Sequence, residues 1–270
     1  MALNDVTLSS SMRQSLTGLQ QVSALMARTT ERLATGRKVN SAVDDPSAYF
    51  GAQDHRSRAG DLSSRKSYMG EALQTVNAAD AGITGITTLM EQAKGLAASA
   101  RSADTTERQA LAAQFDDIMT QIDQLAGDSS YRGTNLLDSG SLTVAFNEDG
   151  TSNITVTGFD ASSSGLGIAA AANDWAADAD IDVALTNLDT ALSTLRSESK
   201  SLASNLNVIT TRQDFTSNMI NTLQSGADNL TLADTNEETA NMLALQVRQQ
   251  LGVTTMGLSA QAERSILNIL

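Results

Sequence analysis

Apolar residues follow a heptad spacing over the last third of the chain. From Ile181 to Leu230 they recur at alternating steps of four and three, and these 50 residues contain no proline. One helix of this length would extend for about 75 Å at 1.5 Å per residue. Because such a helix is far longer than the globular average, it is typical of a bundle in which long helices pack against each other. We therefore predict a helix over 181–230.

Two apolar series in the first half of the chain predict the helices that pack against it. The first comprises Leu62, Met69, Leu73, Val76, Ile83, Ile86 and Met90, and the second Leu111, Phe115, Ile118, Ile122 and Leu125. Glycines interrupt the first series at Gly60, Gly70, Gly82, Gly85 and Gly95. Each glycine costs about 1 kcal/mol relative to alanine inside a helix, and the close approach of a neighbouring helix would explain their presence.

Both ends of the chain carry apolar stripes with few charges. The N-terminal stripe comprises Leu8, Met12, Leu19, Met26 and Leu33, and the C-terminal stripe Leu243, Val247, Leu251, Leu258 and Ile266. Helices rich in Ser, Thr and Gln are marginally stable alone in water. We therefore expect both ends to be disordered in the monomer and to become helical when a partner covers the stripe.

The middle of the chain predicts a β-hairpin. Leu142, Val144 and Phe146 alternate with polar residues, 147–150 supplies turn chemistry, and Ile154 and Val156 alternate on the return. A hairpin of this size needs a surface to pack on. The predicted fold is therefore mainly α, a long helical coiled-coil bundle with a small β-hairpin cap.

Composition excludes several classes of protein. The chain has no cysteine, one histidine, one proline and a net charge of −13, so it has no disulfide framework and no His- or Cys-based metal centre. Nine acids and no Lys or Arg lie between Gly133 and Leu195. A pI near 4.4 argues against nucleic acid as a partner, and no apolar run is long enough for membrane insertion. The N-terminus lacks the pattern of a cleaved secretory signal.

Motifs for chemistry are weak. Asp178, Asp180 and Asp182, with Asp189 further on, are spaced as in a calcium loop, but Val183 stands where an EF-hand needs glycine. Acids favoured at the start of a helix by its dipole are the simpler interpretation. We assign no catalytic, cofactor-binding or metal-binding residue, and we do not expect an enzyme.

One segment resembles a known family. Residues 31–48 read ERLATGRKVNSAVDDPSA, which closely resembles the N-terminal signature of bacterial flagellins. The matching positions are Glu31, Arg32, Leu33, Gly36, Asn40, Ser41, Asp44 and Asp45, and Pro46 follows where a small residue is usual. Paired carboxylates can serve acid–base chemistry, but beside Pro46 we interpret Asp44 as part of a turn and Asp45 as a helix N-cap. The resemblance extends over nearly the whole chain apart from about 140–175.

The resemblance implies a subunit that self-assembles into the flagellar filament for swimming. Residues 1–44 with 232–270 would form a helical tube lining the channel on polymerisation, 45–138 with 176–231 a central bundle, and 139–175 a short variable outer hairpin. Implied partners are other copies of the chain, sister flagellins, an export chaperone, the type III export apparatus, and hook-junction and cap proteins. The implied location is the extracellular filament, reached without a cleaved signal peptide. A hook–filament junction protein and a non-polymerising acidic coiled-coil adaptor are the alternatives.

Two further sites are implied by the family. In flagellins sensed by the vertebrate innate receptor, an Arg, a Leu and a Glu form the contact, and Gln92, Leu96 and Gln114 occupy the equivalent positions here. With both charges replaced by glutamine, we expect weak or no receptor activation; alternatively, these residues only face a neighbouring subunit. Ser162, Ser163 and Ser164 are candidates for O-linked glycan, or form a plain surface loop.

Overall fold

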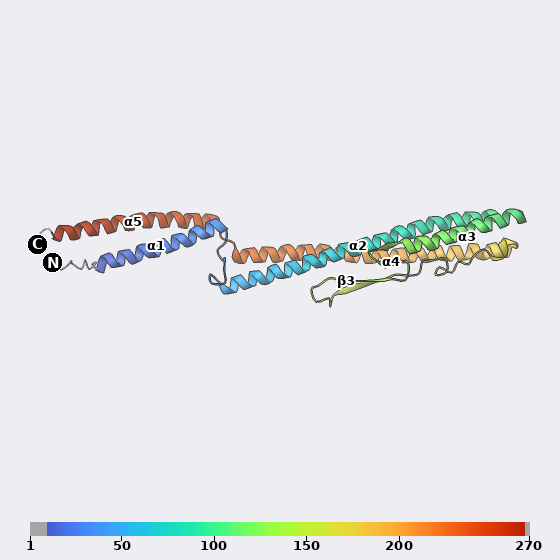
Figure 1. The fold of residues 1–270 in the computed structure, drawn as a ribbon, viewed down its shortest axis with the longest axis horizontal. Coiled ribbons are helices and arrows are strands. Elements are labelled where there is room, and N and C mark those ends of the chain that lie inside the picture. The colour runs from blue at the N-terminus through green and yellow to red at the C-terminus, as the bar shows by residue number, and fades with distance from the viewer. Residues whose placement is uncertain (1–9, 268–270) are drawn as a thin grey trace. The chain divides into compact units, whose positions relative to one another are not determined.

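The computed structural model describes residues 10–267, apart from the side chains of residues 11, 263, 266 and 267. Its helices are α1 (Ser10–Thr35), α2 (Pro46–Ala100), α3 (Thr105–Asp128), α4 (Asp178–Thr231) and α5 (Thr235–Leu267), shown in Figure 1. Short strands pair as β1 (Ser130–Tyr131) with β2 (Thr134–Asn135) and as β3 (Ser141–Ala145) with β4 (Asn153–Thr157). The mainly α fold is thus confirmed. None of the described helices is long and apolar enough to cross a membrane.

The chain divides into two compact units. The central unit comprises Arg58–Thr222, and the terminal unit comprises the residues up to Ser57 together with those from Leu223 onward. Helices α2 and α4 contribute residues to both units. Each unit is described here by itself.

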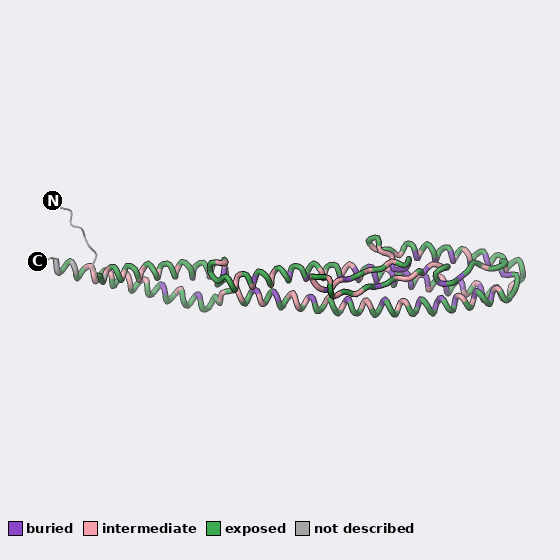
Figure 2. Tube along the Cα trace, turned by 90° about the horizontal axis from the view of Figure 1, so that it is seen from below, coloured by how far each residue is buried: buried purple, intermediate pink, exposed green. Residues whose placement is uncertain are grey.

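Helices α2, α3 and α4 enclose the core of the central unit. The predicted apolar series supply fully buried side chains from each helix, namely Met69, Ile86 and Met90, Phe115 and Ile122, and Leu188 and Leu195. Figure 2 shows these buried positions recurring along the helices among exposed ones. A Cβ atom at Gly82 would lie 2.3 Å from Ser129 Oγ, and one at Gly85 would lie 2.7 Å from Leu125 Cδ2. Close helix approach therefore explains these two glycines, whereas Gly60 and Gly95 have open space.

The predicted hairpin forms and packs on the helices. Leu142 pairs with Val156 and Val144 with Ile154, so the apolar residues share one face, and Val144 and Val156 are buried. The loop that joins the strands is held by α2, because Arg58 Nε donates to Glu148 Oε1 at 2.7 Å and Arg65 Nη2 donates to the Glu148 carbonyl at 3.1 Å. Arg212 of α4 lies over the Phe146 ring, 5.2 Å from its centroid.

A left-handed turn precedes α4. Asn173, Asp174 and Trp175 have φ values of 50°, 48° and 56°, in the region that is unfavourable by about 1–2 kcal/mol per L-residue. Trp175 is fully buried, with its ring centroid 5.0 Å from that of Phe115. Packing of this indole against α3 offsets the backbone strain of the turn.

Candidate assembly site

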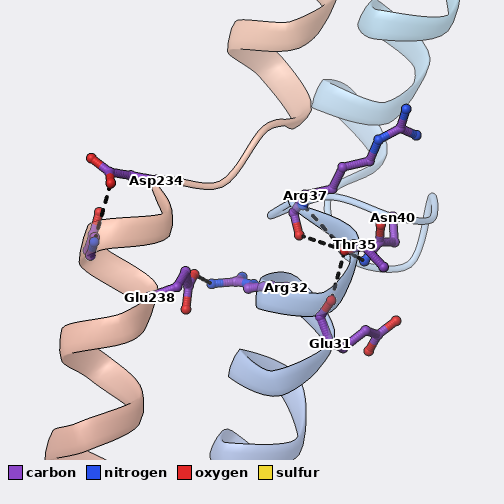
Figure 3. A network of polar contacts seen from close by, with 8 residues as sticks. Glu31, Arg32, Thr35, Arg37, Asn40, Asp234 and Glu238 are labelled. Carbon is purple, nitrogen blue, oxygen red and sulfur yellow. Dashed lines mark hydrogen bonds and ion pairs between the residues drawn. The ribbon is translucent and has the colours of Figure 1, made fainter.

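The family-like segment forms the turn that joins α1 to α2 in the terminal unit (Figure 3). Helix α1 ends at Thr35, and Gly36 follows with a φ of +68°, a conformation that favours glycine. The Thr35 hydroxyl donates to the Glu31 carbonyl at 2.8 Å and accepts from Asn40 Nδ2 at 3.1 Å. The threonine therefore ties the end of α1 to the chain beyond it.

Asp44 and Asp45 have the two structural roles predicted for them. Asp44 Oδ2 accepts hydrogen bonds from the Ser41 N–H at 3.0 Å and the Asn40 N–H at 3.1 Å. These bonds, that from Ser41 being the stronger influence, lower the pKa of the Asp44 carboxyl. Asp45 Oδ1 accepts from the Ala48 N–H at 3.0 Å and caps α2, which begins at Pro46. The pair is thus used for local structure.

Main-chain hydrogen bonds join this turn to the break between α4 and α5. The N–H groups of Lys38 and Val39 donate to the Thr231 carbonyl at 2.8 and 3.3 Å, and the Ala233 N–H donates to the Gly36 carbonyl at 3.0 Å. These bonds satisfy main-chain groups that the helix ends leave unpaired. We call residues 36–45 with 231–234 the joint.

Helix α5 begins beside the joint and is tied to α1 by an ion pair. Asp234 Oδ1 accepts from the Asn236 N–H at 2.8 Å and caps the helix. One turn later, Glu238 Oε1 accepts from Arg32 Nη1 at 2.7 Å, with the glutamate side chain only 8% exposed (Figure 3). The Arg32 Nε atom is buried and has no hydrogen-bond partner among the described residues. Arg32 therefore relies on Glu238 for its charge partner.

Helices α1 and α5 lie side by side, and α5 presents two different apolar faces. One face packs on α1: Leu245 is buried, and a Cβ atom at Gly252 would lie 2.7 Å from Leu19 Cδ2. The other face is the predicted C-terminal stripe, in which Leu243, Val247, Leu251 and Leu258 are 58–67% exposed. The N-terminal stripe differs, because Met12, Leu19, Met26 and Leu33 are half-buried. Leu8 and the side chain of Ile266 lie outside the described residues.

Comparison with known proteins identifies the family. The family model of the bacterial flagellin N-terminal helical region matches residues 4–141. The chain belongs to the bacterial flagellin family. Flagellin FljM of Caulobacter vibrioides is 30% identical over 273 residues, covering 100% of this chain and 99% of that protein. A flagellin of Brucella melitensis is 26% identical over 272 residues, covering 94% of this chain and 95% of the relative. The crystal structure of Bacillus cereus flagellin is 18% identical, with a TM-score of 0.49, and covers 55% of this chain and 88% of that one.

The positions equivalent to the innate-receptor contact lie together in this flagellin. Gln92 and Leu96 of α2 and Gln114 of α3 line one shallow groove with Asp117 and Ile118. Both glutamines are exposed and Leu96 is half-buried. The three residues can therefore meet one partner at once, and the expected weakness of receptor activation stays a prediction.

The serine run forms a hydrogen-bonded turn on α3. Ser163 donates to Asp123 through its N–H at 2.7 Å and through its hydroxyl at 3.1 Å. The hydroxyls of Ser162 and Ser164 are 3.0 Å apart, and Ser164 is the exposed member of the run. A glycan on this turn stays a prediction.

The aspartates at the start of α4 make ion pairs with neighbouring helices. Asp178 Oδ1 lies 2.6 Å from Arg108 Nη2, and Asp182 Oδ1 lies 3.0 Å from Arg101 Nη2. No group of three or more His, Cys, Asp or Glu residues within the described part of the chain could hold a metal ion. The carboxylates thus join the helix ends of the bundle.

The sequence interpretation missed the α5 half of the joint, for which one signal was available. Asp234 is followed three residues later by Glu237, a spacing that is typical of a helix N-terminus. Glu238 carries no such signal, because its role depends on Arg32, which is 206 residues away in sequence.

Proposed function

We propose that this flagellin is a structural subunit that self-assembles into the bacterial flagellar filament for swimming. The observation that carries the proposal is the stripe of Leu243, Val247, Leu251 and Leu258, which stays largely exposed although α1 already packs on α5. Large contiguous apolar surfaces are rare on monomeric soluble proteins and mark interaction sites. In a family of filament proteins, the partner that this stripe fits is another copy of the chain.

Burial of the stripe supplies a driving force for polymerisation. Full burial of one Val or Leu side chain stabilises by about 1.5–3 kcal/mol. Four such side chains per subunit, each more than half exposed before assembly, give a favourable contact that repeats at every subunit added. The α1–α5 pair would then form the channel-lining tube, with the central bundle around it and the β3–β4 hairpin outside.

The family also supports the remaining partners and the location. The subunit would pass unfolded through the type III export apparatus with a chaperone, without a cleaved signal peptide. Outside the cell it would add to the filament beside sister flagellins, between the hook-junction and cap proteins. A structural subunit of this kind needs no cofactor and no catalytic residue.

Seeded polymerisation tests this function. Purified full-length protein, added to short filament seeds, should elongate them into filaments visible by electron microscopy. A variant ending at Thr231, which lacks α5, should keep the helical circular-dichroism signal of its central unit but leave the seeds unextended. Failure of the full-length protein to elongate any seed would overturn the proposal.

A further inference from the structure

The central unit carries an uncompensated basic groove between α2 and α4. Thr84, Thr87 and Thr88 line it from α2, and Arg196, Ser199 and Lys200 line it from α4. The hydroxyls of Thr84 and Thr88 donate to carbonyls of their own helix, so the α2 wall offers mainly methyl groups. Arg196 and Lys200 are exposed and, being four residues apart, lie on the same side of α4.

The charges of this groove have no internal partner. Among the described residues, Arg196 and Lys200 form no ion pair, whereas Lys94, Arg101 and Arg108 of the same helices each pair with an aspartate of α4. The nearby Asp80 carboxylate accepts a hydrogen bond from Ser199 at 3.2 Å. Glu198 is two residues from each cation, and residues with this spacing do not face each other on a helix. The groove is therefore ready for a carboxylate from elsewhere.

Helix α3 carries the complementary surface. Its exposed residues include an acidic and amide stripe at steps of seven, three and four, namely Glu107, Gln114, Asp117, Gln121, Gln124 and Asp128. Arg108 is the one basic residue of α3, and it is engaged by Asp178. Gln114 and Asp117 line the α2–α3 groove, so the acidic stripe and the basic groove flank α2 on different sides.

We infer that the basic groove of one subunit binds the acidic α3 stripe of a second copy of this chain, with Asp117 between Arg196 and Lys200. Because two different surfaces meet, the contact is heterologous and repeats from copy to copy, which produces open helical assemblies. The glutamines beside Asp117 accept hydrogen bonds from the guanidinium and ammonium groups. The inference rests on the proposed function and adds to it the surfaces by which central units join.

Charge reversal on each side tests the contact. The groove variant is Arg196→Glu/Lys200→Glu, and the stripe variant is Gln114→Lys/Asp117→Lys. Like charges facing each other across a contact are costly, so each variant alone should elongate wild-type-like seeds of its own type at least about tenfold more slowly than the wild type. An equimolar mixture of the two should regain elongation, since the acidic groove of one then faces the basic stripe of the other. The deficits should shrink at about 1 M salt, where the screening length falls to about 3 Å.

The outcomes separate this contact from the proposed function. Thermal melting by circular dichroism shows that each variant is folded before assembly is scored. Folded variants that elongate as fast as the wild type would overturn the contact and leave the filament function intact, and so would a mixture that stays inactive. A wild-type protein that fails to polymerise would overturn both.

Discussion

Arg32 and Glu238 join the two terminal helices directly beside the joint. The guanidinium Nη1 lies 2.7 Å from the carboxylate, and the glutamate side chain is almost fully buried. Residues 206 positions apart in the sequence thereby fix the register of α1 against α5. The exposed stripe of α5 depends on this register, because a rotation of the helix would turn the stripe toward α1.

Replacement of Glu238 should weaken this pairing. The variant Glu238→Ala leaves a partly buried guanidinium without its carboxylate, and we expect a loss of about 2–3 kcal/mol in the free energy of opening of the α1–α5 pair. Hydrogen exchange of the main chain over 235–245 measures this opening. In the double variant Arg32→Met/Glu238→Met no charge remains unpaired, so most of the protection should return. Equal loss in the single and double variants would show that the ion pair does not hold the helices.

Two glycines of α2 should respond in opposite directions to the same substitution. Gly82→Ala places a methyl group 2.3 Å from Ser129 Oγ and 2.9 Å from Ser129 Cβ, so α3 must shift, at a cost of about 1–3 kcal/mol. Gly95→Ala meets nothing within 4 Å and should stabilise by about 0.5–1 kcal/mol. Chemical denaturation of both variants measures the difference. A loss of stability at Gly95 similar to that at Gly82 would contradict the close packing of α2 on α3.

The joint should loosen in acid because of Asp44. Its pKa is lower in the folded chain, chiefly through the Ser41 and Asn40 N–H bonds, than the ordinary value of about 3.9. Its contribution is therefore present above about pH 4 and is lost as the pH falls through the lower folded pKa. Amide exchange of 38–44, followed from neutral pH to about pH 2, should show this step. Asp44→Asn should remove the step and exchange faster at neutral pH; an unchanged acid profile in that variant would contradict the role of Asp44.

The sequence predicted those elements whose signal is local. The hairpin lies where Leu142, Val144 and Val156 alternate around turn residues, because alternation alone assigns a strand face. Helix α4 begins at Asp178, three residues before the first apolar position of its heptad series at Ile181. The acids of its first turn are part of the helix, and apolar periodicity does not register them.

Features that depend on distant partners could not be predicted in this way. The face of α5 that packs on α1 contains Gly252 opposite Leu19, and a glycine adds nothing to an apolar pattern. The stronger Leu and Val pattern of the same helix marks the exposed stripe instead. The left-handed turn at 173–175 also gave no signal, because Trp175 is held there by its contact with Phe115 on another helix.

The elongation rate of seeded filaments, measured with a substituted α5 stripe, tests the central claim most directly. The variant Val247→Gln/Leu251→Gln keeps good helix formers but removes two apolar side chains that are 58% and 60% exposed in the single chain. Arg248→Gln, at an exposed position on the same helix, is the matched control. The account predicts wild-type elongation for the control and at least about a tenfold loss for the stripe variant. Elongation of the stripe variant at the wild-type rate would contradict assembly through this face of α5.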